Sequence, residues 1–277
     1  MKIYTIHWTA HPLKDQAWYE AEIRNKMMGP DEVARELDLN FALSVSGKVF
    51  TPFVANRHVV DKFHYNKDLP VYRVFDFGRV NCTLYIQRDG HGRTRVLHER
   101  ILESSSTPEQ KAVALEDSRE LFEGARFIDI CDPAGSDKGH SGADTDVQIL
   151  ENPGDEGSAG IIRPDYFRIR EYPTKERKVQ ARKMVMRDLQ STPGGEEALT
   201  IYGPGCPVLV KGFNGSYHYK KDLAGNTLDK IYEAHPVEDV FDCLFYYYLE
   251  ADGSSHYDDG LEPYYNNDVA PNEWTGF

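Results

Sequence analysis

Three aspartates interrupt apolar segments in separate parts of this 277-residue chain. Asp76 lies in VYRVFDFG, Asp132 follows RFIDIC, and Asp242 lies within HPVEDVFDCLFYYY. An ionised carboxylate in apolar surroundings is unfavourable unless a cation compensates its charge. A divalent metal is the simplest compensation, and ligands that are all oxygen atoms favour Mg²⁺ or Mn²⁺ over zinc. The three acids therefore suggest a metal site.

The elements around these aspartates could bring them together. The segments that carry Asp76 and Asp132 have strand composition, and neighbouring strands of a sheet lie about 5 Å apart. Asp239 and Asp242 are three residues apart on a predicted helix and share one of its faces. Two Mg²⁺ or Mn²⁺ ions about 4 Å apart could activate water and stabilise the leaving 3′ oxygen of a phosphodiester. These four aspartates are therefore the candidate catalytic and metal-binding residues.

Each of these signals also has a structural interpretation. The aspartate of DFG and the Asp132-Pro133 pair are both common turn formers. Asp239 and Asp242 could belong to an ordinary solvated helix face, although Asp242 has apolar neighbours on both sides. Taken together, in this order and on these elements, the acids favour catalysis.

The strand and helix pattern predicts an α/β fold. VYRVFDF, CTLYIQ and TRVLHERIL have the composition of three antiparallel strands separated by glycine-containing turns. A helix should follow, with Thr107 as its N-cap, Pro108 in its first turn and Gln110 completing a capping box. RFIDIC is then a short strand expected to pair in parallel with the first. The order βββαβ predicts a central mixed sheet of five or more strands, flanked by helices.

The remaining segments complete the expected organisation. The segment YFRIREY should lead into a basic helix capped by Thr174. PVLVKGFNGSYHYKK is expected to form a hairpin that turns at Asn214-Gly215, and the last helix should cover about residues 235 to 249. The predicted division is a helical arm over residues 1–66, a main domain over 67–250, and a flexible acidic tail over 251–277.

Composition limits the class of protein. Without a signal peptide or a long apolar run, the chain is expected to be soluble and intracellular, and its four scattered cysteines are expected to be reduced. The net charge of −13 opposes nucleic-acid binding at long range, but residues 161 to 190 carry nine Lys and Arg against four Asp and Glu. DNA binding is therefore expected to be local.

Two segments could contact the phosphates of DNA. On the basic helix, basic residues recur at helical spacing, and the predicted hairpin adds three lysines. A solvated helix face is the alternative interpretation of such a pattern. The candidate DNA-binding residues are Lys175, Lys178, Arg182, Lys183, Arg187, Lys211, Lys220 and Lys221.

The segments DEVARELDLNFALSVSGKVF, VYRVFDFGRVN, DICDPAG, CPVLVKGFNGSYHYKK and EDVFDCLFYYY resemble, in that order, the nuclease half of tailed-phage large terminases. The resemblance covers nearly the whole chain and implies an RNase H-like fold. It also implies an endonuclease that cuts concatemeric double-stranded DNA during genome packaging, with metal-binding acids at Asp76, Asp132 and Asp242. Many members have a histidine three residues before the last aspartate, where this chain has Asp239.

The resemblance also implies partners and a location. They are the terminase ATPase domain, the small terminase subunit and the portal protein, in the cytoplasm of the host cell. The chain lacks a GxxxxGK[ST] phosphate-binding loop, so we expect a fragment that cuts DNA without pumping it, whose first 66 residues join motor to nuclease. Two alternatives remain open: another RNase H-like nuclease of the resolvase or recombinase type, and a catalytically silent DNA-binding or docking module.

Overall fold

The computed structural model describes residues 7–26, 37, 47–136, 144–162, 175–221, 227–232 and 234–251. The helices are α1 (Gln16–Lys26), α3 (Ala55–His58), α4 (Thr107–Glu120), α5 (Asp146–Glu151), α6 (Lys175–Asp188), α7 (Pro207–Lys211) and α8 (Val237–Ala251). The strands are β1 (Val59–Val60), β2 (Val71–Asp76), β3 (Val80–Arg88), β4 (Thr94–Glu103), β5 (Phe127–Cys131), β6 (Leu199–Tyr202), β7 (Tyr219–Lys221) and β8 (Thr227–Ile231). The segment YFRIREY, the cap Thr174 and residues 252–277 of the predicted tail lie outside the described residues.

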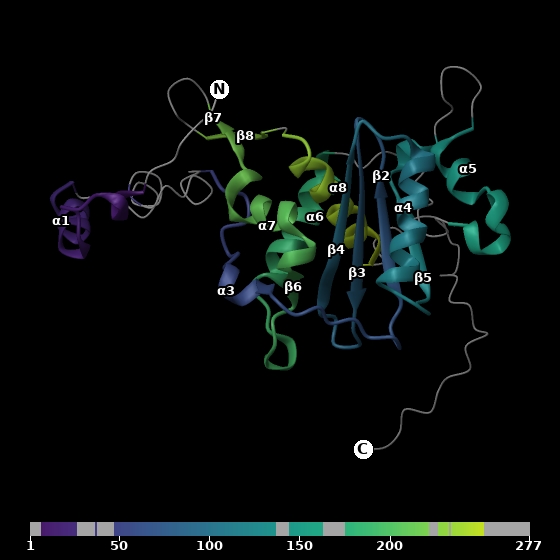
Figure 1. The fold of residues 1–277 in the computed structure, drawn as a ribbon, viewed down its shortest axis with the longest axis horizontal. Coiled ribbons are helices and arrows are strands. Elements are labelled where there is room, and N and C mark those ends of the chain that lie inside the picture. Colours follow the sequence, from purple (N-terminus) through teal and green to yellow (C-terminus); the bar gives the residue numbers. More distant parts are fainter. Residues whose placement is uncertain are drawn as a thin grey trace, which may run out of the picture.

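A six-stranded mixed sheet forms the centre of the molecule, in the order β1-β6-β4-β3-β2-β5 (Figure 1). Strands β2, β3 and β4 form an antiparallel meander, and β5 pairs in parallel with β2. This confirms the predicted mixed sheet and its βββαβ order. Strand β6 joins the opposite edge in parallel with β4 and with the short β1, and it was not anticipated from the sequence.

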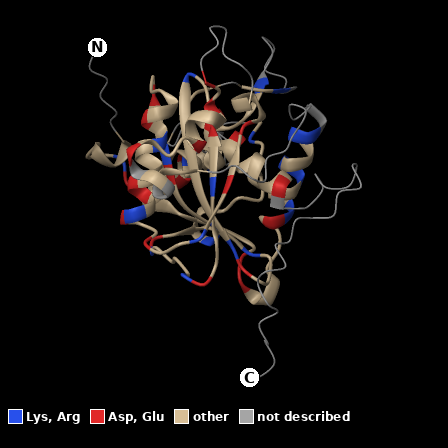
Figure 2. Ribbon diagram, turned by 90° about the vertical axis from the view of Figure 1, so that its right-hand side faces the viewer, with Lys and Arg blue, Asp and Glu red and all other residues tan. Residues whose placement is uncertain are grey.

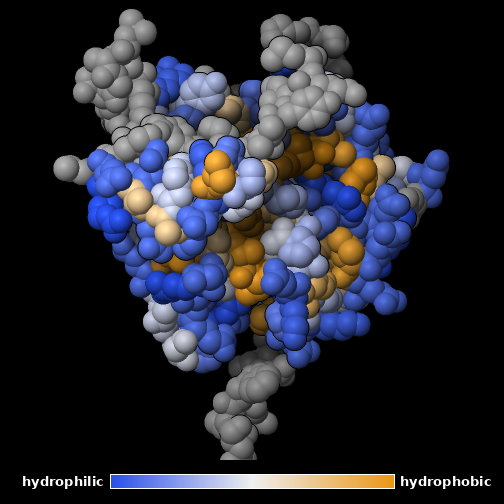
Figure 3. Space-filling model, turned by 60° about the vertical axis from the view of Figure 1, so that its left-hand side comes forward, coloured by the Kyte–Doolittle hydropathy of each residue, from blue (hydrophilic) through white to orange (hydrophobic). Residues whose placement is uncertain are grey.

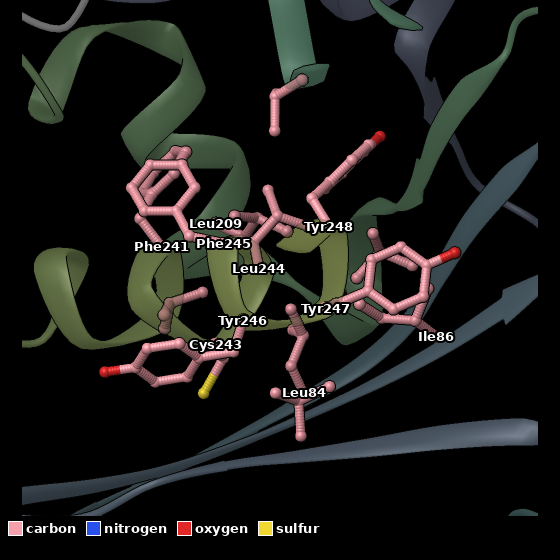
Figure 4. Packing of buried hydrophobic residues seen from close by; sticks show 14 of the residues in the cluster. Leu84, Ile86, Leu209, Phe241, Cys243, Leu244, Phe245, Tyr246, Tyr247 and Tyr248 are labelled. Atoms are coloured by element: carbon pink, nitrogen blue, oxygen red, sulfur yellow. The ribbon is translucent and has the colours of Figure 1, made fainter. Parts of the chain in front are cut away.

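Two layers of helices cover the opposite faces of the sheet. Side chains alternate along β3: Leu84 and Ile86 reach toward α8 (Figure 4), whereas the Tyr85 hydroxyl donates a hydrogen bond of 3.2 Å to Asp117 of α4. Since alternate residues of a strand face opposite sides, α8 and α4 lie on opposite faces. We call these the α8 face and the α4 face of the sheet.

Helix α8 is apolar around most of its circumference because it is enclosed on several sides. It packs on β2, β3 and β5, and α6 and α7 pack against it in turn. The buried side chains of this helix are mostly aromatic or aliphatic and include Phe241, Leu244, Phe245, Tyr247 and Tyr248. Figure 3 shows apolar residues gathered in the middle of one face, with hydrophilic residues around them.

The chain before residue 67 contributes to this core. Phe50 and Phe53 are buried, and both rings pack against Phe213. Strand β1 joins the edge of the sheet. Helix α1 lies apart from the sheet (Figure 1), with Trp8 stacked on Tyr19 at a centroid distance of 5.1 Å. The predicted boundary at residue 66 stays a prediction. Among the described residues, no helix is both long and apolar enough to cross a membrane.

The predicted cap of α4 was wrong by one residue. The N-cap is Ser106, and its capping box is completed by Glu109, whose carboxylate accepts the Ser106 backbone N–H at 2.7 Å. Gln110 is not free to complete a box from Thr107, because its side-chain amide turns to the sheet and donates to the backbone oxygen of Cys82 at 2.8 Å. Two overlapping box patterns exist in the sequence, and this buried contact selects one of them.

The predicted hairpin turn at Asn214-Gly215 was also wrong. Residues 207–211 form α7, a π-helical turn follows over Gly212–Ser216, and the hairpin lies further on, between β7 and β8. The carboxylate of Glu99 on β4 accepts the backbone N–H groups of Val208 at 2.6 Å and Leu209 at 2.9 Å. This buried acceptor satisfies the first free N–H groups of a helix, so it stabilises a helix in a segment of strand-like composition.

Candidate active site

The register of the sheet places Asp76 and Asp132 side by side on the α8 face. Asp76 pairs with Cys82 at the end of β2, and side chains of paired residues share a face. Cys82 faces α8, because it lies two residues before Leu84 on β3, and Leu84 reaches toward that helix (Figure 4). Asp132 continues β5 beyond Cys131, with its N–H donating to the Phe75 backbone oxygen at 2.9 Å. Both carboxylates therefore lie where the parallel strands β2 and β5 end.

The turn after β5 fixes the Asp132 side chain. Asp132 Oδ1 accepts the backbone N–H of Ala134 at 3.0 Å, and the Asp132 backbone oxygen accepts that of Gly135 at 3.0 Å. Gly135 lies directly against the ring of Phe77, and a Cβ built there would be 2.4 Å from that ring. A glycine is therefore needed for the turn that follows Asp132 to pack against the end of β2.

Helix α8 brings two further aspartates to the same place. Asp239, Asp242 and Tyr246 follow one another at i, i+3 and i+7, so they share the helix face toward β2. The Tyr246 hydroxyl lies 3.4 Å from Asp76 Oδ1 and can donate to it. His235 Nδ1 donates to both oxygens of Asp239, at 2.9 and 3.0 Å. The four predicted acids thus come from β2, β5 and α8 and gather at one end of the sheet.

Electrostatic coupling shows that these carboxylates are close neighbours. Burial raises the pKa of Asp76 well above its usual value, and the charges of Asp242, Asp132 and Asp239 raise it further. Burial is also the largest influence on the pKa of Asp242, which stays raised although the neighbouring Lys178 lowers it. Figure 2 shows acidic and basic residues interspersed over the ribbon, so the net negative charge is not confined to this end. The repulsion within the cluster is therefore local, because it arises from several negative charges close together at a buried position.

Lys178 of α6 contacts the cluster directly. Its Nζ donates to Asp242 Oδ1 at 2.9 Å and to Oδ2 at 2.8 Å, and the Asp242 side chain is only 15% exposed. Burial lowers the pKa of Lys178, but the neighbouring carboxylates, Asp242 foremost, together raise it overall. A residue predicted to contact DNA is therefore held by one of the predicted metal ligands.

The carboxylate oxygens of the four aspartates are the kind of ligand that a hard divalent cation prefers. These oxygen atoms are largely buried and repel one another, and bound positive charge would relieve both effects. As the side chains stand, no group of three or more His, Cys, Asp or Glu within the described ranges is arranged to hold a metal ion. The four aspartates thus lie near one another without forming a metal-binding geometry, and Asp242 forms an ion pair with Lys178.

The other candidate DNA contacts lie on three separate elements, α6, α7 and β7. On α6, Lys183 and Arg187 are exposed, Arg182 is half-buried, and Arg187 pairs with its neighbour Asp188 at 3.1 Å. Lys211 is exposed at the end of α7, and Lys220 is half-buried on β7. The side chains of Lys175 and Lys221 lie outside those that the structure describes.

Two contributors to this site were missed from the sequence. Tyr246 lies in a run of aromatic residues, and its one signal was its position four residues after Asp242 on the same helix. Gln110 Nε2 donates to the backbone oxygen of Asp76 at 3.3 Å, as well as to Cys82 and Thr83, and so fixes the end of β2. Its contact partners are distant in the chain, at a separation of 28 residues for Cys82, where local patterns carry no information.

No protein-family model and no curated protein matches this chain. Solved structures do. The nuclease domain of the P22 large terminase is similar at a TM-score of 0.51 and 13% identity, over 75% of this chain and 93% of that domain. The large terminase of a thermophilic bacteriophage, in complex with ADP, is similar at a TM-score of 0.51 and 14% identity, over 85% of this chain and 52% of that one.

The same thermophilic phage terminase in complex with ATP-γ-S gives a TM-score of 0.51 at 14% identity, over 88% of this chain and 55% of that one. This chain thus spans about half the length of that terminase. Identity is low, so the similarity concerns the arrangement of the backbone. The chain has the RNase H-like fold found in the nuclease domains of large terminases.

Proposed function

We propose that this protein is a metal-dependent endonuclease that cuts concatemeric double-stranded DNA during phage genome packaging. The observation that carries the proposal is the gathering of four aspartates at one end of the sheet, three of them buried (Asp76, Asp132 and Asp239) and one partly buried (Asp242). Burial and mutual repulsion raise the pKa of Asp76 there. A fold does not imply a function, so the site has to support the activity. The acids suggest metal-dependent hydrolysis, and the similarity to terminase nuclease domains suggests double-stranded DNA as the substrate.

Each acid has a defined part in the proposed site. Asp76 and Asp132 would hold one divalent ion at the ends of their strands, and Asp242 and Asp239 would complete the site for a second. Two bound Mg²⁺ or Mn²⁺ ions would supply an activated water and stabilise the leaving 3′ oxygen. Tyr246 would orient the carboxylate of Asp76, to which it lies within 3.4 Å.

His235 would orient Asp239, the residue that replaces the histidine common in the family. Its ring donates to both Asp239 oxygens, and this hydrogen bond raises the pKa of His235. Asp239 would then face the site with a fixed side chain, which suits a ligand more than a general base. The substitution of histidine by aspartate is thereby compatible with metal binding.

Basic residues on α6, α7 and β7 would hold the DNA backbone. Lys183 and Arg187 on α6 and Lys211 on α7 are exposed, and Lys175, Lys220 and Lys221 are proposed to add to them. A cut that does not depend on sequence needs phosphate contacts more than base contacts. By the same reasoning from the fold, the proposed partners are a terminase ATPase domain, a small subunit and a portal protein in the host cell cytoplasm.

The direct test is the nicking of supercoiled plasmid DNA in Mn²⁺ or Mg²⁺ by the purified chain. The chain should nick and linearise plasmid with either ion, EDTA should stop it, and Asp132→Asn should lower the rate at least about a hundred-fold, since it removes one charged ligand. Asp61→Asn should cut like the parent, because Asp61 is exposed and follows β1, at the sheet edge opposite β5.

Two results would contradict the proposal. If neither ion supports nicking while duplex binding survives EDTA, the chain is a DNA-binding or docking module. If four-way junctions are cut and plain duplex is not, it is an RNase H-like nuclease of the resolvase type.

A further inference from the structure

The Lys178 side chain reaches from one helix to the proposed metal ligands of another. Helix α6 packs on α8, and the ammonium group makes hydrogen bonds to both oxygens of Asp242, at 2.9 and 2.8 Å. The ammonium group uses one lone pair on each oxygen of Asp242, and its positive charge repels a second cation at the same carboxylate. The two cations therefore compete for one ligand.

The lysine charge acts beyond Asp242. It also lowers the pKa of Asp76, which lies on a different element, so the ammonium group acts on two acids of the cluster. Its effect has the same sign as that of a bound ion, since it compensates buried carboxylates that otherwise repel one another. Lys178 thus provides part of the compensation that the proposed divalent ions would provide.

The ammonium group of Lys178 is accessible to an anion from solvent. Its side chain is 36% exposed, so the ammonium group is accessible from solvent, and it shares α6 with the exposed Lys183. A lysine is a point charge on a four-carbon stem and can move from one anion to another by changing rotamers. A DNA phosphate bound along α6 would be such an anion, and Lys178 would face it from the edge of the acid cluster.

We propose that Lys178 is an internal counter-ion that holds Asp242 until DNA binds, so that DNA phosphates and divalent metal favour each other's binding. On this proposal, which rests on the proposed nuclease function, DNA draws the ammonium group from Asp242 to a phosphate. Asp242 is then available to a metal ion. By thermodynamic linkage, metal binding must strengthen DNA binding by the same factor. The device limits metal loading, and with it cutting, to the DNA-bound protein.

The test measures Mn²⁺ affinity, from the free Mn²⁺ signal in electron paramagnetic resonance. The parent chain, Lys178→Met and the control Lys67→Met are compared with and without a short phosphorothioate duplex, which keeps its charge and resists cleavage. Lys178→Met removes the ammonium and keeps an unbranched stem, so it should bind Mn²⁺ about ten-fold more tightly than the parent without DNA. The duplex should tighten Mn²⁺ binding by the parent about ten-fold and by Lys178→Met hardly at all.

Lys67→Met should resemble the parent with and without DNA, because Lys67 is exposed and precedes β2, at the strand end opposite Asp76. Lys178→Arg, which keeps a cation beside Asp242, should also bind Mn²⁺ weakly without DNA, and thermal unfolding checks that each variant is folded. Equal Mn²⁺ affinity for the parent and Lys178→Met, or an equal gain from DNA in both, would overturn this inference and leave the nuclease proposal standing. Absence of Mn²⁺ binding in every variant, with and without DNA, would overturn both.

Discussion

The two faces of the sheet carry buried acids in different ways. On the α4 face, the Arg73 guanidinium forms a two-pronged pair with Asp129 at 2.6 and 2.9 Å, and Arg100 forms one with Asp117. On the α8 face, Asp76, Asp132, Asp239 and Asp242 lie together, and Lys178 engages one of them. Asp129 and Asp117 on the α4 face each pair with an arginine, whereas the four aspartates on the α8 face lie together at one site.

The difference separates structural charges from candidate functional ones. A guanidinium pairs with a carboxylate through two parallel hydrogen bonds, which leaves no ligand position for a metal. Arg73 is further fixed by donating to Ser118 at 2.9 Å and by lying over the Phe127 ring at 4.1 Å. On the α8 face the charges of three other aspartates add to burial in raising the pKa of Asp76, and a divalent cation would relieve this repulsion.

Breaking the α4-face pair should produce the largest loss of stability. Arg73→Met leaves Asp129, which is 6% exposed, as a buried charge without its arginine. Removal of one member of a buried pair costs about 3–5 kcal/mol. The free energy of unfolding in urea should fall by that amount, and Mn²⁺ should not restore it, because this pair is not a metal site.

The double variant Arg73→Met/Asp129→Leu gives the control for that loss. It removes both charges and should recover most of the stability. If Arg73→Met cost less than about 1 kcal/mol, or if Mn²⁺ recovered the loss, the contrast between the two faces would be invalid.

Neutralising an acid on the α8 face should have the opposite effect. The folded-state pKa of Asp76 is raised, so the stability that Asp76 contributes is present below its unfolded value of 3.8 and is lost as pH rises through the folded value. Asp76→Asn keeps an oxygen that can accept from Tyr246 and removes the charge. In EDTA at pH 8 we expect it to be more stable than the parent by about 1–2 kcal/mol, although inactive as a nuclease.

The measurement is urea unfolding in EDTA at pH 8 and at pH 4. The gain from Asp76→Asn should shrink at pH 4, where the parent carboxyl is protonated as well. The exposed Asp61→Asn should change stability by less than about 0.5 kcal/mol at both values of pH. A loss of stability at pH 8 on replacing Asp76 would mean that its charge is compensated within the protein.

The smallest expected effect concerns DNA affinity. Charge reversal by Lys183→Glu on α6 should weaken duplex binding several-fold in fluorescence anisotropy, and it should reduce the salt dependence of binding by about one phosphate contact. Arg119→Glu is the matched variant, because Arg119 is exposed on α4, which covers the opposite face. Equal loss from both variants would indicate a nonspecific charge effect and no DNA path along α6.

Much of the fold was predictable because its signals are local. The three strands, the following helix and β5 have apolar runs separated by glycine turns, and the handedness of the crossover sets the parallel pairing of β5 with β2. That pairing is what places Asp76 beside Asp132. The position of Asp242 was accessible for a similar reason, since an acid within VFDCLFYYY must lie at the buried side of its helix or close to it.

The unpredicted features depend on contacts between distant residues. The helix α7 forms in a valine-rich segment because Glu99 accepts its first N–H groups from far along the chain; the separation from Val208 is 109 residues. Lys178 has the same sequence signal as a solvated lysine, and only the packing of α6 on α8 turns it toward Asp242, 64 residues away. The local sequence pattern shows that a residue can form a contact of this kind, but it does not show which distant residue is the partner.

The central claim is that the acids of the α8 face form a divalent metal site. Crystals of the protein bound to a phosphorothioate duplex and soaked in Mn²⁺ test it directly through anomalous diffraction. We predict anomalous peaks between Asp76, Asp132 and Asp242, with Lys178 displaced from Asp242, and no peak beside Asp129 or Asp117. Saturating Mn²⁺ without a peak at the four aspartates, and with Lys178 still bound to Asp242, would contradict the account.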